Sequence, residues 1–192
     1  TPRTTYVALY VNGEFRSIKI HVEHIDEEFA DSWFGNKEGN LYKCLYSPLP
    51  ADLSYLEDEN YQEYGGGTVY EEKNNDPTSD YSDLAGFVDF FNNRPSDEVY
   101  EGLVHHLHID NFLRYLASNV ALGSWDDYWY GSNNYYLYRN TDNDRFELIP
   151  YDYDNCLGID WAGVNWSQRH FQNWGDGGFG STPAPLVDTV FE

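Results

Sequence analysis

The chain has 192 residues, of which 41% are hydrophobic and 18% aromatic, so it can bury the core of one domain. It holds 11 Lys and Arg against 33 Asp and Glu, and the formal charge of −22 excludes binding to nucleic-acid backbones and anionic membranes. No run approaches the ~20 apolar residues of a membrane span, and no signal peptide is visible, so we expect a processed or excised piece.

The N-terminal part of the chain reads as a β-hairpin over residues 4–24. Asn12-Gly13 is the two-residue turn signal between two β-rich runs. In the second run, alternation separates an apolar face from a polar face: Ile18, Ile20 and Val22 against Lys19, His21 and Glu23. We therefore expect the second strand of the hairpin to have one apolar face and one polar face.

A short helix follows, with Asp26 as its N-cap, Phe34 near its end and Gly35 as its stop. Residues 40–46 then predict a strand, and residues 47–80 predict a loop rich in Pro, Gly and acidic residues.

The second half of the chain reads as helices followed by a hairpin. Apolar spacing predicts helices over 81–92 and 110–122, the second with Asp110 as N-cap and Gly123 as stop. The remaining expectations are strands at 134–139 and 146–151 joined by a turn at 141–144, a surface-wrapping segment at 157–183 and a helix at 185–192. This order predicts an α+β fold and not a βαβ repeat.

Lys43 lies in an unusual setting for a lysine. Strand alternation puts it on one face with Leu41 and Leu45, and Cys44 on the other. It is either a lysine on an edge strand or a half-buried cation with a partner. The functional interpretation is a lysine that holds phosphate.

Two carboxylates, Asp152 and Asp154, follow the last predicted strand. Such a pair suits a hard cation such as Mg²⁺, Mn²⁺ or Ca²⁺, and the alternative is a solvated turn. The pattern is not an EF-hand, because Cys156 and Leu157 occupy the fifth and sixth positions counted from Asp152, where that loop needs an oxygen ligand and Gly.

The predicted hairpin brings an amide toward this acidic pair. If its turn centres on residues 142–143, then Asn134 lies opposite Tyr151, next to Asp152. The chain enters this hairpin from the 110–122 helix through Asp126-Asp127. A kinase catalytic centre has the same order of parts: a helix, an Asp, an Asn, two strands and a second Asp. The spacing differs, because Asn134 follows Asp126 by eight residues where ordinary protein kinases have five.

These segments together resemble the CotH kinase family, atypical kinases first known from spore coats and widespread in secreted bacterial proteins. The resemblance covers about residues 5–160 and rests on these runs in order: Val11-Asn12-Gly13-Glu14, Val22-Glu23-His24-Ile25-Asp26, Gly39-Asn40-Leu41-Tyr42-Lys43, Ile109-Asp110-Asn111-Phe112-Leu113-Arg114-Tyr115-Leu116-Ala117, Gly123-Ser124-Trp125-Asp126, Asn134-Tyr135-Tyr136-Leu137-Tyr138-Arg139 and Ile149-Pro150-Tyr151-Asp152-Tyr153-Asp154.

The resemblance implies roles for particular residues. Lys43 would hold the phosphates of ATP and contribute to catalysis, and Asp126 would be the catalytic aspartate. Asn134 and Asp152 would hold Mg²⁺ or Mn²⁺. Asp154 is a second candidate ligand, and Glu23 is a candidate cofactor-binding residue that would pair with Lys43.

The sequence departs from the family pattern at three places. Ser124 stands where an Asn is expected, Asn133 where a His is frequent, and Ser17 where a Gly is usual in the first hairpin. None of these changes removes a proposed catalytic group. Because a chain at −22 repels the triphosphate of ATP, which carries about four negative charges, binding would need local compensation by a metal ion and by Lys43.

The resemblance implies one kinase-like domain over 1–192, truncated at its C-terminal end, with a strand-rich ATP-binding part (1–80) and a helical part with the catalytic hairpin (81–192). The implied function is transfer of the γ-phosphate of ATP to Ser or Thr hydroxyls of secreted or surface proteins, with basic substrate segments suiting the acidic surface. The implied location is extracellular, at the cell surface or in a spore coat. The alternative is an inactive adhesion module that binds carbohydrate or Ca²⁺.

Other signals are weaker. His105-His106-Leu107-His108 lacks a neighbouring Cys and favours packing over zinc. The tryptophans at 161, 166 and 174 could stack on sugars, but packing is the more ordinary role. Cys44 and Cys156 form a disulfide only if the lysine and aspartate motifs meet in space, and the expected orientation of Cys44 argues against it.

Overall fold

The computed structural model describes residues 1–74, 79–161, 163–181 and 183–191. The expected loop over 47–80, the segment 157–183 and the terminal helix over 185–192 therefore each lie partly outside the described residues. No helix formed by the described residues has both the length and the apolarity to cross a bilayer.

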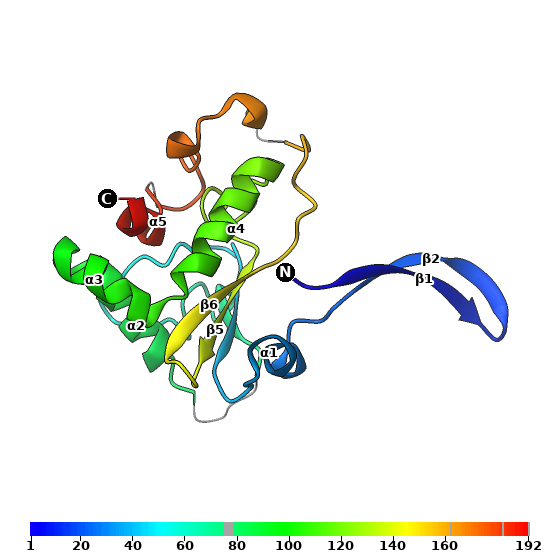
Figure 1. Ribbon diagram of the computed structural model, residues 1–192, viewed down its shortest axis with the longest axis horizontal. Coiled ribbons are helices and arrows are strands. Elements are labelled where there is room, and N and C mark those ends of the chain that lie inside the picture. The colour runs from blue at the N-terminus through cyan, green and yellow to red at the C-terminus, as the bar shows by residue number, and fades with distance from the viewer. Residues whose placement is uncertain (75–78, 162, 182, 192) are drawn as a thin grey trace.

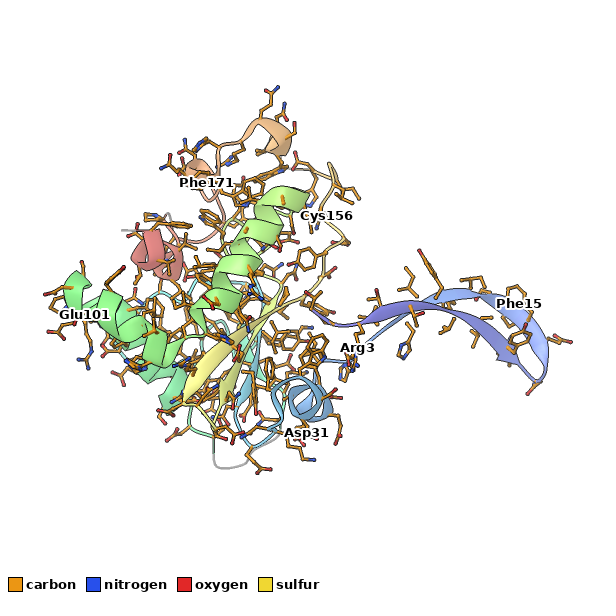
Figure 2. The ribbon with its side chains drawn as sticks, viewed as in Figure 1. Arg3, Phe15, Asp31, Glu101, Cys156 and Phe171 are labelled. Carbon is orange, nitrogen blue, oxygen red and sulfur yellow. The ribbon has the colours of Figure 1, made fainter. Side chains whose placement is uncertain are left out.

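The N-terminal hairpin forms as predicted and projects from the rest of the molecule as an arm (Figure 1). Strand β1 (Thr4–Val11) pairs antiparallel with β2 (Glu14–Val22). Asn12 and Gly13 have φ of 52° and 82°, the left-handed geometry that a tight two-residue hairpin turn requires. In Figure 2, Phe15 lies near the far end of this arm and Arg3 at its base.

The main sheet has four antiparallel strands in the order β4-β3-β5-β6. They are β3 (Leu41–Cys44), β4 (Tyr70–Glu72), β5 (Tyr135–Asn140) and β6 (Arg145–Pro150). Strand β3 is therefore internal and pairs directly with β5. Segments from both halves of the sequence thus build one sheet, which places the lysine strand beside the predicted catalytic hairpin.

Helices cover one face of this sheet and form the larger core (Figure 1). They are α2 (Ser82–Asn93), α3 (Ser96–His106), α4 (Ile109–Leu122) and α5 (Pro185–Phe191). They pack on alternate strand residues such as Tyr42, Cys44, Tyr135 and Leu137. The chain then forms two 3₁₀ turns, η1 (Trp166–Gln168) and η2 (Phe171–Asn173), and Trp166 in η1 and Trp174 directly after η2 are buried in this core.

The opposite face of the sheet carries a smaller core beneath α1 (Glu27–Phe34). It contains Phe29 and Ala30 of α1 and, from the strands, Leu41, Tyr136, Tyr138 and Ile149. Helix α1 has the predicted boundaries, because Asp26 Oδ1 accepts a hydrogen bond from Phe29 N at 3.0 Å and Gly35 ends the helix at φ 73°. Helices and antiparallel strands occupy separate layers, which confirms the α+β class.

The prediction that Asp110 is the N-cap of α4 is wrong. The helix begins at Ile109, His108 is its N-cap, and Asp110 lies in the first turn. His108 N donates to Phe146 O of β6 at 3.0 Å, and its ring Nδ1 lies 2.9 Å from both carboxylate oxygens of Glu147. The helix therefore starts where the chain leaves the edge of the sheet.

Besides the 3₁₀ turns η1 and η2, one strand and one α-helix were not predicted. Strand β4 has three residues and lies within the expected loop over 47–80, and α3 fills the stretch between the two predicted helices.

Candidate functional site

The loop that follows α4 carries Asp126 into position. Gly123 ends the helix at φ 65°, and the fully buried Trp125 anchors the next turn by donating from Nε1 to Ile159 O at 3.0 Å. Asp126 is half-buried beside this anchor, while Asp127 points into the core and is 3% exposed. The two adjacent carboxylates therefore have opposite environments.

Three side-chain amides hold the carboxylate of Asp126. Asn133 Nδ2 donates to Oδ1 at 3.1 Å, and Asn134 Nδ2 and Asn155 Nδ2 donate to Oδ2 at 3.0 and 3.1 Å. Asn134 Nδ2 also lies 3.2 Å from the backbone carbonyl of Asp126. Donors from the start of the β5–β6 hairpin and from the chain beyond it thus fix the orientation of one carboxylate.

Gly131 allows the chain to fold this tightly around Asp126. A Cβ at this position would lie 2.8 Å from Asp126 Oδ1 and 3.0 Å from Asp127 N. Two residues nearby, Ser132 and Asn134, have positive φ values of 51° and 54°. Backbone strain of this kind is found most often at functional sites.

The β5–β6 hairpin has the predicted register. Tyr135 pairs with Pro150, and beyond the strand ends Tyr151 N donates to Asn134 O at 3.2 Å. Asn134 is therefore opposite Tyr151, and Asp152 follows directly with φ 53°. The predicted register, with Asn134 opposite Tyr151 and therefore close in the chain to Asp152, is confirmed.

Asp152 and Asp154 are exposed at the end of this hairpin. Partial desolvation, the charge of Asp154 and a smaller effect of Asp126 raise the pKa of Asp152 above its usual value. Three carboxylates thus share one region, and their mutual repulsion favours a cation there. Asn134 Oδ1 accepts no hydrogen bond from the described residues, so it adds a free amide oxygen to the carboxylate oxygens.

This donor set fits a magnesium ion that keeps most of its ligands from water and phosphate. Among the described residues, no three His, Cys, Asp or Glu side chains form a preassembled metal site. Mg²⁺ typically binds through one or two carboxylates together with water and substrate phosphates. Asn134 and Asp152 supply oxygens of the right kind, with Asp154 adjacent.

Lys43 is half-buried on two tyrosine rings. Its Nζ lies 5.1 Å from the ring centroid of Tyr151 and 6.0 Å from that of Tyr136. In the described part of the chain it makes no ion pair. Because β3 is internal, the edge-lysine interpretation is wrong, and Lys43 is a cation without a carboxylate partner beside the residue that precedes Asp152.

The expected pairing of Glu23 with Lys43 is not observed. Glu23 Oε1 forms an ion pair with the guanidinium of Arg3, and Trp33 Nε1 donates to Glu23 Oε2 at 3.2 Å. Hydrogen bonds from the Arg3 side chain and backbone hold the pKa of Glu23 at about 2. Glu23 therefore fixes the base of the arm against α1.

Asp127 was not singled out from the sequence, yet it is the most perturbed acid of the site. Burial raises its pKa to about 7, although hydrogen bonds from Tyr130 N and Asn119 Nδ2 oppose the shift. Asn133 and Asn155 were not singled out as site residues either. The available signals were their position, directly before Asn134 and after Asp154, and the departure of Asn133 from the family pattern.

A surface pocket borders the acidic end of the hairpin. It is lined by Tyr151, Asp152 and Tyr153, by Ser118 and Leu122 of α4, and by residues at the base of the arm, Thr4 and Val22 among them. Lys43, Asp126 and Asn134 do not line it. The pocket therefore opens on the Asp152 side of the site.

The weaker sequence signals resolve into structural roles. Both cysteines are free: Cys44 is buried in the sheet, and Cys156 Sγ lies 2.9 Å from Tyr153 O. His106 packs on Phe90 at 4.1 Å between centroids. Trp166 and Trp174 are buried, whereas Trp161 is exposed and stacks on Phe179.

Comparison with known proteins places these features in a family. The family model described as CotH kinase protein matches residues 1–192. The inner spore coat protein H of Bacillus subtilis (strain 168) is 26% identical over 189 residues, which cover 98% of this chain and 49% of that protein. The chain thus spans about half the length of this curated relative. Since the family model covers the whole chain, the protein belongs to the CotH kinase family.

Proposed function

We propose that this chain is an atypical protein kinase domain that transfers the γ-phosphate of ATP to Ser or Thr hydroxyls. The observation that carries the proposal is the three-amide clamp on Asp126, which lies beside an exposed pair of carboxylates, Asp152 and Asp154. A solvated surface turn has no need for such a clamp. Family membership supports the same reaction class.

In the proposed reaction, Asp126 positions the attacking hydroxyl. The hydroxyl oxygen forms a bond to the γ-phosphorus, the bond from that phosphorus to the β–γ bridging oxygen breaks, and ADP leaves with the electron pair. Asp126 accepts the proton of the hydroxyl. Asn133, Asn134 and Asn155 keep its carboxylate from rotating away from the nucleophile.

The remaining groups compensate the charge of the triphosphate. Asn134 and Asp152 would hold Mg²⁺ or Mn²⁺, with Asp154 as a further ligand, and the ion would neutralise charge on the transferring phosphate. Lys43 would bring a second positive charge, held on the rings of Tyr136 and Tyr151. Since the chain carries −22, these local charges are what allow an anionic nucleotide to bind.

We further propose that the substrate is a secreted or surface protein, including a spore-coat protein. The curated relative is named as an inner spore coat protein, which supports such a location. A basic substrate segment is favoured because the acidic surface would attract it.

Ligand-linked stability tests the nucleotide-binding part of the proposal. Thermal melts are compared with ATP, Mg²⁺, Mn²⁺ or Ca²⁺ alone and with ATP plus Mg²⁺ or Mn²⁺. The proposal expects the combined ligands to raise Tm more than the sum of the separate ligands. A shift with Ca²⁺ alone and none with the nucleotide would favour the adhesion module.

Transfer of labelled phosphate tests the reaction. The wild-type chain is incubated with labelled ATP and a basic protein, beside Asp152→Ala and the matched control Glu101→Ala. The control removes an exposed acid of α3, which lies far from the site (Figure 2). Label transfer by the wild type and the control, but not by Asp152→Ala, is expected; equal transfer by all three would contradict the proposal.

A further inference from the structure

A buried hydrogen-bond relay joins the two loops that carry the site. Asn119, in the last turns of α4, donates from Nδ2 to Asp127 Oδ2 at 2.6 Å and accepts at Oδ1 from the hydroxyl of Tyr153 at 2.8 Å. Asn119 is 1% exposed, and both ends of its amide are therefore used within the protein. One side chain links a residue adjacent to Asp126 with the residue between Asp152 and Asp154.

The geometry points to a positioning role: we propose that Asp127, Asn119 and Tyr153 set the distance between the Asp126 loop and the Asp152–Asp154 loop. This inference takes its ligand, a metal–nucleotide complex, from the proposed function. The hydrogen bonds that carry the inference do not depend on that function. None of the three side chains would touch nucleotide or metal. They are positioning residues that act through their neighbours.

Further hydrogen bonds hold Asp127 and Asn119 in place, so the relay can transmit their position to the site. Asp127 Oδ1 accepts from Tyr130 N at 2.9 Å, and Asp127 O accepts from Asn133 N at 3.0 Å, so Asp127 cannot shift without moving the amides around Asp126. On the helix side, Asn119 O accepts from Ser124 N at 2.9 Å. Asn119 is thus tied to the loop as well as to α4.

The other end of the relay is Tyr153, which lies between two exposed carboxylates. Asp152 has a positive φ, and Asp152 and Asp154 are exposed, whereas the Tyr153 side chain between them turns inward. The Tyr153 hydroxyl, together with Asn155 Nδ2 on Asp126, therefore anchors the loop that carries the two carboxylates. Groups that orient metal ligands typically change metal affinity or activity by about 10- to 100-fold when they are removed.

Tyr153→Phe tests the relay, because it removes only the hydroxyl. Its matched control is Tyr138→Phe, which removes another hydroxyl, bonded to Asn36 O at 2.7 Å in the separate core under α1. Amide hydrogen exchange without ligand is the first measurement. Tyr153→Phe should accelerate exchange at the amides of Tyr151 and Leu157, which donate to Asn134 O and Leu122 O, and leave the β5–β6 hairpin protected. Tyr138→Phe should leave these two amides unchanged.

Binding of Mn²⁺–ATP, followed by calorimetry, is the second measurement. Tyr153→Phe is expected to weaken Kd by about 10- to 100-fold, with Tyr138→Phe close to wild type. Exchange at Tyr151 and Leu157 that is unaltered by Tyr153→Phe would overturn the relay, as would unaltered Kd. A wild-type chain that binds no Mn²⁺–ATP would instead overturn the proposed function, and the exchange experiment would still decide the relay.

Discussion

Asp126 and Asp127 are neighbours in sequence, but the fold gives them different chemistry. Asp126 meets solvent on one side and three amide donors on the other, so it is oriented and accessible. Asp127 is enclosed in the core and accepts bonds from Tyr130 N and Asn119 Nδ2. At the scale of single residues, the first suits reaction and the second suits support.

Replacing Asp126 with Asn should separate turnover from binding. The change keeps the shape of the side chain but removes the proton acceptor, so kcat for phosphate transfer should fall by about 10²- to 10⁴-fold. The dissociation constant for Mg²⁺–ATP, measured by calorimetry, should stay close to wild type because Asp126 is not assigned to the metal. An ATP affinity that falls as far as the turnover would contradict this role.

Replacing Asp127 with Asn should change how stability depends on pH. The pKa of Asp127 is raised to about 7 by burial, so the folded state holds a proton that the unfolded state has released. The wild type therefore loses stability as pH rises from about 4 to 7, by on the order of 4 kcal/mol from this group. Asp127→Asn has no titrating group at this position and therefore does not lose this stability as pH rises.

The measurement is urea unfolding of both proteins at pH 5 and pH 8. Relative to wild type, Asp127→Asn should be more stable at pH 8 than at pH 5, which means that its free energy of unfolding is higher in the comparison at pH 8. Asp97→Asn, an exposed acid in the first turn of α3, is the control and should show no such trend. An identical difference at both pH values would mean that Asp127 does not titrate in this range.

At the scale of elements, local patterns predicted those segments whose signals are contained in their own sequence. Asn12-Gly13 sets the turn of the arm, and Asp26 and Gly35 bound α1. Helix α3 was missed because its 11 residues bury only Val99 and Leu103, a stripe too thin for periodicity to detect. Strand β4 has three residues and depends on pairing with β3, which no local pattern encodes.

The same distinction applies to the site. The register of the β5–β6 hairpin follows from its turn, so the position of Asn134 opposite Tyr151 was predictable. The clamp on Asp126 was not, because Asn155 reaches it only after the chain has passed around the hairpin. Lys43 was recognised as unusual, but its aromatic platform depends on the packing of three strands.

The apolar face of the arm is exposed, since no other part of the chain that the structure describes covers it. Tyr6 is 76% exposed and Ile20, its partner across the hairpin, 66%. Ile20→Thr keeps a β-branched side chain and should therefore change the free energy of unfolding by less than about 0.5 kcal/mol. Ile25→Thr, at a buried position near α1, should cost more than about 1 kcal/mol because it leaves space and buries a hydroxyl.

Urea unfolding of the two variants beside wild type provides the comparison. Equal costs for Ile20→Thr and Ile25→Thr would contradict the open arm and would mean that its apolar face is covered in solution.

At the scale of the whole molecule, charge is distributed unevenly. The arm over residues 4–22 holds one acid, Glu14, and two bases, Arg16 and Lys19, so it is slightly positive and the remainder of the chain carries more than the whole net charge of −22. Ion pairs offset little of it, since the described residues form few and most of these lie at the surface. The folded body is thus under electrostatic self-repulsion.

Salt should therefore stabilise this protein. The Debye length falls from about 30 Å at 0.01 M to about 8 Å at 0.15 M ionic strength, which screens repulsion across the body but leaves contacts in the core unchanged. Tm measured by calorimetry should rise over this range with NaCl and with KCl alike. MgCl₂ at matched ionic strength should raise Tm further if Asp152 and Asp154 bind the ion. Asp152→Ala should lose only this additional increase in Tm and keep the increase that NaCl also produces. A Tm that falls or stays constant between 0.01 and 0.15 M NaCl would show that specific ion pairs, and not net repulsion, dominate the electrostatics of the fold.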